Sequence, residues 1–192
     1  MTAQKPKLVA IILLWILCGG LIGLPGLTVA AIQPGVSVNG LEQRIHALVN
    51  QERKRAGLRP LAWDPALQRI ARKHSQNMAR ARFFSHDDPQ GRDFSDRYRH
   101  AGYRCAIPLG HRTIGLGGEN IAQNNLYRGY VRSRGKTTYQ WNTEAQIAAA
   151  VVSQWMESAG HRRNILTSSF RREGVGVAID KGGKVFITQN FC

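Results

Sequence analysis

Two histidines and a glutamate, far apart in the sequence, carry the side chains best suited to chemistry in this chain. His86 lies in "FFSHDD", Glu119 in "GGENIA" and His161 in "SAGHRRNIL". Two imidazoles and a carboxylate can hold a divalent metal ion such as Zn²⁺, or can orient one another for proton transfer. The three share no short ligand spacing of the kind found in metalloproteases. The residues alone therefore leave another interpretation open, in which each histidine caps a helix end or lies at the surface.

The elements expected to position these residues are mainly helices. Apolar residues recur at helical spacing in several stretches, and Asp64 before Pro65 is a typical helix start, as is Thr143. Gly160 is expected at the left-handed position after the last long helix, so that the helix would end just before His161. The predicted helices begin near residues 41, 65, 94 and 143 and end by residues 57, 82, 102 and 160.

The C-terminal stretch changes to a period of two. Val175, Val177 and Ile179 alternate with small or polar residues, a second β-rich run covers 184–191, and "KGG" between them suits a turn, so we expect a β-hairpin. Residues 103–142 are rich in glycine and basic residues, and we expect them to be irregular. Helices beside a small antiparallel sheet predict an α+β domain with the architecture of an α–β–α sandwich.

The N-terminus has the features of an apolar targeting helix. Two lysines precede an uncharged apolar run from Leu8 to Ile32, which fits a cleaved signal peptide and is also long enough to span a bilayer as an anchor. Either alternative places the rest of the chain outside the cytoplasm, secreted or associated with the membrane. The expected organisation is 1–31 as signal peptide or anchor, 32–40 as a short linker and 41–192 as the domain.

Export gives a further meaning to the two cysteines that follow the targeting segment. In an oxidising compartment Cys105 and Cys192 are expected to form one disulfide, which would hold the C-terminus and close a long loop. Such a bond stabilises a fold by roughly 4 kcal/mol in the chain-entropy model. Two free thiols, or a bond to another chain, are the alternatives.

The chain is strongly basic. It has 27 Lys and Arg against 12 Asp and Glu, a net charge of +15, and without residues 1–31 the balance is 25 against 12, or +13. Basic residues gather in 92–104 and in 128–136, the latter beside Tyr127, Tyr130 and Tyr139. For an exported protein we expect an anionic envelope lipid, glycan or polymer, or a protein ligand, as partner rather than nucleic acid. A solvated basic face is the alternative.

Several of these stretches together resemble the motifs of a known family. "FFSHDD", "GGENIA", "AAAVVSQWMESAGHRRNIL", "REGVGVAI" and "FITQNF" occur in the order found in bacterial members of the CAP superfamily, also called the SCP domain family. That superfamily includes cysteine-rich secretory proteins, antigen 5 and pathogenesis-related class 1 proteins. The likeness runs from about Leu41 to Cys192. It implies an α–β–α sandwich with a central cleft in which His86, Glu119 and His161 are three of the cleft residues.

The resemblance does not fix an activity, because members of this family share a fold more firmly than a reaction. Eukaryotic members usually carry a second acid three positions after the helix tryptophan, whereas this chain has Ser158 after Trp155. We therefore expect a binding or interaction module rather than an enzyme, with the His/Glu cleft holding Zn²⁺ or another divalent metal. The alternative is a metal-assisted hydrolase that uses His86 and His161, with Glu119 as ligand or base.

Overall fold

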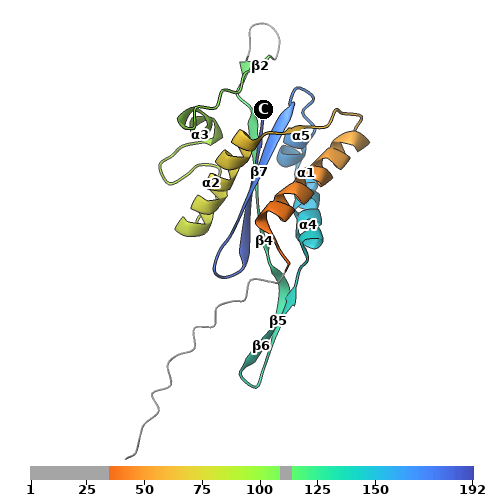
Figure 1. Ribbon diagram of the computed structural model, residues 1–192, viewed down its shortest axis with the longest axis vertical. Coiled ribbons are helices and arrows are strands. Elements are labelled where there is room, and N and C mark those ends of the chain that lie inside the picture. Colours follow the sequence, from red (N-terminus) through yellow and green to blue (C-terminus); the bar gives the residue numbers. More distant parts are fainter. Residues whose placement is uncertain (1–34, 109–113) are drawn as a thin grey trace, which may run out of the picture.

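The computed structural model describes residues 35–108 and 114–192 (Figure 1). The predicted targeting helix, with the apolar run from Leu8 to Ile32, lies outside these residues. No helix in the described ranges is long and apolar enough to cross a membrane. In chain order the elements are α1 (Val38–Arg55), β1 (Ala62–Trp63), α2 (Pro65–Ala81), α3 (Phe94–His100), β2 (Ile107–Pro108), β3 (Ile114–Gly115), β4 (Gly118–Asn125), β5 (Tyr127–Ser133), β6 (Lys136–Trp141), α4 (Glu144–Glu157), α5 (Ala159–Ile165), β7 (Arg172–Ile179) and β8 (Lys184–Phe191).

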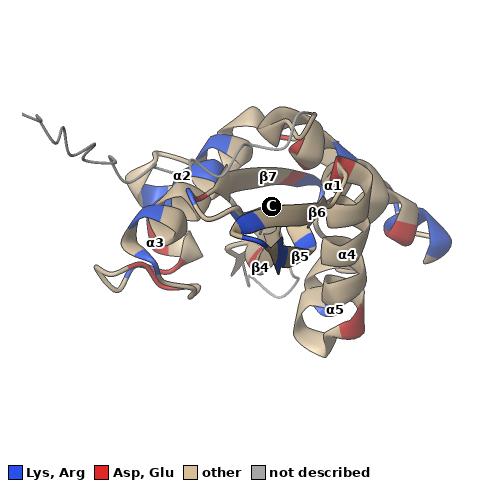
Figure 2. Cartoon of the chain, turned by 90° about the horizontal axis from the view of Figure 1, so that it is seen from below, with Lys and Arg blue, Asp and Glu red and all other residues tan. Residues whose placement is uncertain are grey.

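These elements form the predicted α–β–α sandwich. The central four-stranded sheet has the order β1-β7-β8-β4. Strands β4, β8 and β7 pair antiparallel, and the short β1 pairs parallel with β7. Helices α2 and α3 lie on one side of the sheet and α1, α4 and α5 on the other, and an end-on view shows the three layers (Figures 1 and 2).

The alternating sequence of β7 explains how both helical layers fit against it. Val175 and Val177 are buried in the large apolar core. Gly176 between them allows α2 to pack directly on the strand, because a Cβ added to Gly176 would lie 1.9 Å from the backbone nitrogen of Arg72. Only glycine permits so close an approach of helix and strand backbones.

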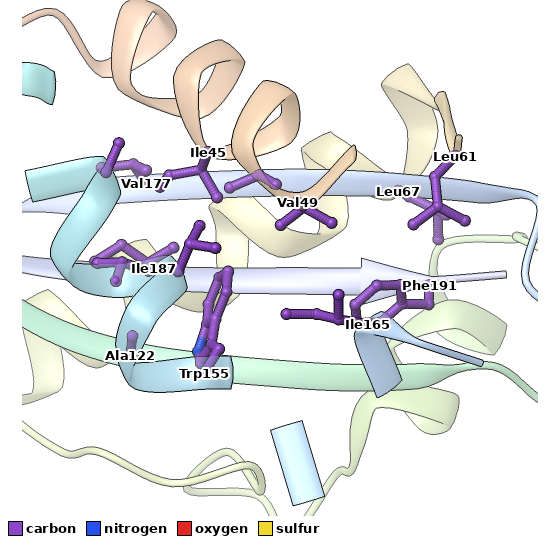
Figure 3. Packing of buried hydrophobic residues seen from close by; sticks show 14 of the residues in the cluster. Ile45, Val49, Leu61, Leu67, Ala122, Trp155, Ile165, Val177, Ile187 and Phe191 are labelled. Atoms are coloured by element: carbon purple, nitrogen blue, oxygen red, sulfur yellow. The ribbon is translucent and has the colours of Figure 1, made fainter. Parts of the chain in front are cut away.

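The large core includes the space between the sheet and the helical layer that contains α1 and α4 (Figure 3), and it extends to Leu67 and Ile70 of α2. Trp155 of α4 is fully buried in it, and its indole N–H donates to the carbonyl oxygen of Ile121 on β4 at 3.0 Å. Ile45 and Val49 approach from α1, and Ile187 from β8 (Figure 3). This packing fixes α4, and the segment that follows it, next to β4.

The local helix signals are confirmed. The side chain of Asp64 accepts hydrogen bonds from the N–H groups of Ala66 and Leu67 at the start of α2. Thr143 caps α4 in a reciprocal arrangement with Gln146. The C-terminal hairpin is formed by β7 and β8 as predicted. These features depend on neighbouring residues alone, which is why the sequence specifies them.

Two local expectations are wrong. Gly160 is not left-handed but lies inside α5, because Ser158 adopts an extended conformation (φ −87°, ψ 122°) and separates α4 from a second short helix. His161 thus belongs to the first turns of α5 rather than leaving a helix end. Residues 103–142 are not irregular either, since they contain β4 and the β5–β6 hairpin. The first five residues of β4 are all buried, so the strand shows no alternation in its sequence.

The predicted disulfide is confirmed. Cys105, in the segment after α3, is bonded to Cys192 at the end of β8, with 87 residues of sequence separation. Both cysteines are buried. The bond joins the loop region on one side of the sheet to the C-terminus of the chain.

Candidate functional site

The first contact of the site joins His86 to Glu119. Glu119 lies near the start of β4, and its side chain is only 1% exposed, whereas the side chain of His86, in the loop between α2 and α3, is 51% exposed. Nδ1 of His86 lies 2.9 Å from Oε1 of Glu119. This hydrogen bond to the carboxylate raises the pKa of His86, because it stabilises the imidazolium form.

Arg97 of α3 completes this part of the site, although the sequence did not single it out. Its side chain is 8% exposed and donates from one terminal nitrogen to Oε2 of Glu119 at 2.5 Å. The other terminal nitrogen donates to the carbonyl oxygen of His86 at 2.7 Å. Arg97 therefore fixes both partners at once. In a sequence crowded with arginines, a buried arginine has no periodic signal that separates it from an exposed one.

The loop that carries His86 has a further support in α2. His74 of α2 is fully buried, and its Nε2 lies 3.0 Å from the carbonyl oxygen of Ser85. Burial lowers the pKa of His74. A neutral His74 that donates to the residue preceding His86 holds the loop in place.

Side-chain amides hold α5 against β4. Asn164 of α5 donates to the carbonyl oxygen of Glu119 at 3.0 Å and to the side-chain oxygen of Asn120 at 2.9 Å. Asn120 in turn donates to the carbonyl oxygen of His161 at 3.2 Å. These bonds place His161 beside the strand of Glu119. They were missed at the sequence level, although Asn120 directly follows Glu119 and Asn164 lies one helical turn after His161.

His161 has the opposite electrostatic character to His86. Burial lowers its pKa, and the positive charge of protonated His86 lowers it further. Its Nδ1 is buried and has no hydrogen-bond partner among the described residues. The lowered pKa favours the uncharged form of His161, in which one ring nitrogen carries the lone pair that metal binding requires.

The geometry bears directly on the predicted ligand set of His86, Glu119 and His161. Within 35–108 and 114–192, no group of three or more His, Cys, Asp and Glu residues is placed to hold a metal ion. Both carboxylate oxygens of Glu119 are engaged, one by His86 and one by Arg97. Glu119 thus fits a role in orienting His86, a common role for carboxylates behind metal-binding histidines. His86 and His161 are left as the candidate metal ligands.

Comparison with known proteins identifies the family. Residues 46–191 match the family described as "CAP: Cysteine-rich secretory protein family". The chain belongs to this family. It is 32% identical over 155 residues to "Uncharacterized protein YkwD" of Bacillus subtilis (strain 168), covering 81% of this chain and 48% of that protein. It is 31% identical over 150 residues to "Uncharacterized membrane protein YlbC" of the same organism, covering 78% and 34%. The CAP chain thus spans half or less of the length of these curated relatives.

Solved structures agree with this assignment. The crystal structure of an extracellular protein containing a SCP domain from Bacillus anthracis str. Ames is 32% identical, with a TM-score of 0.57 over 80% of this chain and 40% of that one. An outer surface protein from Borrelia burgdorferi is 14% identical, with a TM-score of 0.60 over 81% of this chain and 94% of that one, and shows likeness of fold alone. The resemblance found in the sequence motifs of this CAP chain is confirmed.

Proposed function

We propose that this CAP protein is an extracytoplasmic binding module whose cleft takes a divalent cation, Zn²⁺ in the first place, between His86 and His161. The observation that carries the proposal is the chain of contacts from Arg97 through Glu119 to Nδ1 of His86. A histidine whose Nδ1 is fixed by a carboxylate presents Nε2 in a defined direction, and imidazole nitrogen suits Zn²⁺. A bound cation would supply an electrophilic centre for an oxygen or anionic group of a ligand.

The state of Glu119 favours binding over hydrolysis. A general base needs a carboxylate oxygen within reach of a water molecule. In this structure the oxygens of Glu119 face Arg97 and His86, and the carboxylate is buried. Ser158 stands where eukaryotic members carry a second acid. A metal-assisted hydrolase would therefore have to release Glu119 from Arg97 before this residue acted as a base.

The location and the wider partners belong to the same proposal. The Bacillus anthracis relative is described as an extracellular protein, and the apolar run from Leu8 to Ile32 suits export or anchoring of this chain as well. The net charge of +13 outside the targeting segment favours an anionic envelope lipid, glycan or polymer as a partner, and a protein ligand is the further candidate. Such association should weaken as salt is raised.

Calorimetric titration of Zn²⁺ into the full chain tests the cleft. The wild type should bind Zn²⁺, and the His86→Ala, His161→Ala double variant should lose that binding. His100→Ala is the matched control, since His100 is an exposed histidine at the end of α3. Equal binding by wild type and double variant would contradict the proposal. Zinc-dependent hydrolysis of a peptide, ester or glycan that the double variant lacks would favour the hydrolase instead.

A further inference from the structure

The second basic segment of the chain folds into a hairpin that stands apart from the sandwich. Among the described residues, strands β5 and β6 pair only with each other, and they project beyond the layers at the end of β4 opposite Glu119 (Figure 1). Tyr130 of β5 is 61% exposed and Val131 is 58% exposed. A two-stranded hairpin is only marginally stable by itself. Exposed apolar side chains on such a hairpin therefore suggest that another surface covers them.

One face of the hairpin is aromatic. Tyr130 is paired with Tyr139 across the strands, and Tyr127 is paired with Trp141. Ring centroids lie 6.0 Å apart for Tyr130 and Tyr139, 4.9 Å for Tyr127 and Tyr139, and 5.1 Å for Tyr139 and Trp141. The four rings form a continuous platform from the base of the hairpin to its exposed part. Tyr and Trp, with an apolar ring and a polar edge, are the residues that gather where a membrane meets water.

The charged residues of the same hairpin are all basic. Residues 127–141 include four basic residues and no acid, and the four are Arg128, Arg132, Arg134 and Lys136. None of them forms an ion pair with a residue in the described ranges. Figure 2, seen from the end where the hairpin projects, shows basic positions along its strands. Unpaired cations beside exposed rings complement an anionic surface.

The chain enters the domain at the foot of this hairpin. The N–H of Ser37, the cap of α1, donates to Oε1 of Glu144 at 2.6 Å, and Glu144 follows Trp141 by three residues. Figure 1 shows the N-terminal end of α1 beside the base of β5 and β6. The preceding residues, with their apolar run from Leu8 to Ile32, are therefore joined to the domain at the end from which the hairpin projects.

We infer that the β5–β6 hairpin is a contact surface for a bilayer that contains anionic lipids. The rings suit the depth of the headgroups, and the cations suit the lipid phosphates. An anionic wall polymer would satisfy the charges, but the junction of the apolar run at the hairpin base favours the bilayer. The inference rests on the extracytoplasmic location proposed above and is independent of the cleft.

Hydrogen exchange by mass spectrometry on the full chain tests this surface. The chain is reconstituted in vesicles of phosphatidylcholine alone and in vesicles that also contain phosphatidylglycerol. Because one cation near an anionic surface favours contact by about fivefold, the hairpin amides should exchange at least about fivefold more slowly in the anionic vesicles. Added NaCl should remove the difference, and the amides of α2 should not respond.

Two charge variants separate the hairpin from the overall charge. The hairpin variant carries Arg128→Gln, Arg132→Gln, Arg134→Gln and Lys136→Gln and should lose the protection. The matched variant removes the same charge from exposed positions on and between α1 and α2 and should keep it; it carries Lys54→Gln, Arg59→Gln, Arg69→Gln and Lys73→Gln. Thermal unfolding of both variants checks that the domain is intact. A Tyr130→Ser variant, which keeps all four basic residues, applies the same exchange measurement to the aromatic face.

Three outcomes would overturn the inference: equal exchange of wild-type hairpin amides in the two vesicles, equal loss of protection in both charge variants, or protection by soluble dextran sulfate without protection by anionic vesicles. The last would assign the hairpin to a polymer. Zinc titration of the same variants distinguishes this inference from the proposed cleft, because the hairpin variant should bind Zn²⁺ as the wild type does.

Discussion

Replacing Arg97 by methionine tests what the buried charges of the site contribute. The side chains of Arg97 and Glu119 are 8% and 1% exposed, so the variant leaves a carboxylate where water cannot replace the guanidinium. Removing one partner of a buried ion pair costs about 3–5 kcal/mol. His86 remains as a half-exposed partner of Glu119, which favours the lower end of this range. We expect the free energy of unfolding to fall by about 3 kcal/mol.

A second substitution shows whether this loss comes from the unpaired charge. Adding Glu119→Gln to Arg97→Met removes the charge that was left behind, so the double variant should be more stable than the sum of the two single losses predicts. For groups in direct contact this coupling is about 0.5–3 kcal/mol. Arg99→Met, on the same helix, is the matched control. Arg99 pairs with Asp96 at the surface, and surface pairs contribute about 1 kcal/mol or less.

Urea unfolding followed by tryptophan fluorescence measures the wild type, the two single site variants, the double variant and Arg99→Met. A loss for Arg97→Met no larger than that for Arg99→Met would refute the argument, and so would strict additivity of the two site substitutions. Either result would mean that the carboxylate is solvated or neutral in the folded protein.

The loss of unfolding free energy in Arg97→Met should also depend on pH, and the protonation of His86 sets the direction of this dependence. The hydrogen bond to Glu119 raises the pKa of His86, so the folded state binds this proton more tightly than the unfolded chain. Its stabilising effect is complete below the ordinary pKa of histidine and is lost as pH rises through the raised pKa. In Arg97→Met the protonated His86 is the remaining cation beside Glu119. The variant should therefore be more impaired at pH 8 than at pH 5.5, and the reverse order would contradict this account.

Two further predictions concern the backbone and the disulfide. Gly160→Ala should raise the free energy of unfolding by about 0.5–1 kcal/mol, since Gly160 is helical with no atom within 4 Å of an added Cβ. Destabilisation by Gly160→Ala would instead indicate that Gly160 is left-handed. Gly176→Ala should lower the free energy of unfolding by about 3 kcal/mol or more, because the added Cβ would collide with the backbone of α2. Serine at both Cys105 and Cys192 should lower the free energy of unfolding by about 4–5 kcal/mol for a loop of this length, and a loss below about 1 kcal/mol by calorimetry would show that the bond does not constrain the unfolded chain.

The parts of the fold that the sequence predicted depend on local patterns. Asp64 and Thr143 begin helices through bonds to residues two or three positions away, and β7 shows the alternation of a strand with two different faces. Strand β4 was missed because it is covered on both faces, and the break at Ser158 was missed because one extended residue does not disturb a helical pattern. Both depend on packing that no local window contains.

The candidate site was likewise predicted only in part from the sequence. His86, Glu119 and His161 were found because each stands in a motif of the CAP family, and the structure places Glu119 in contact with His86. The role of Arg97 was not found, because its burial follows from how α3 packs near the start of β4. The sequence also suggested Glu119 as a metal ligand, whereas its contacts favour a positioning role. The family motifs suggested His86, Glu119 and His161, and the fold shows which partners Glu119 contacts.

The central claim is that His86, held by Glu119 through Nδ1, and His161 together receive a cation. Nuclear magnetic resonance of the full chain with ¹⁵N-labelled histidine tests it most directly, as Zn²⁺ is added at a pH where both rings are neutral. We predict that the Nε2 resonance of His86 and one ring nitrogen of His161 shift together, that Nδ1 of His86 keeps its hydrogen bond to Glu119, and that His100 does not respond. Unchanged rings of His86 and His161, or coordination through Nδ1 of His86, would contradict the account.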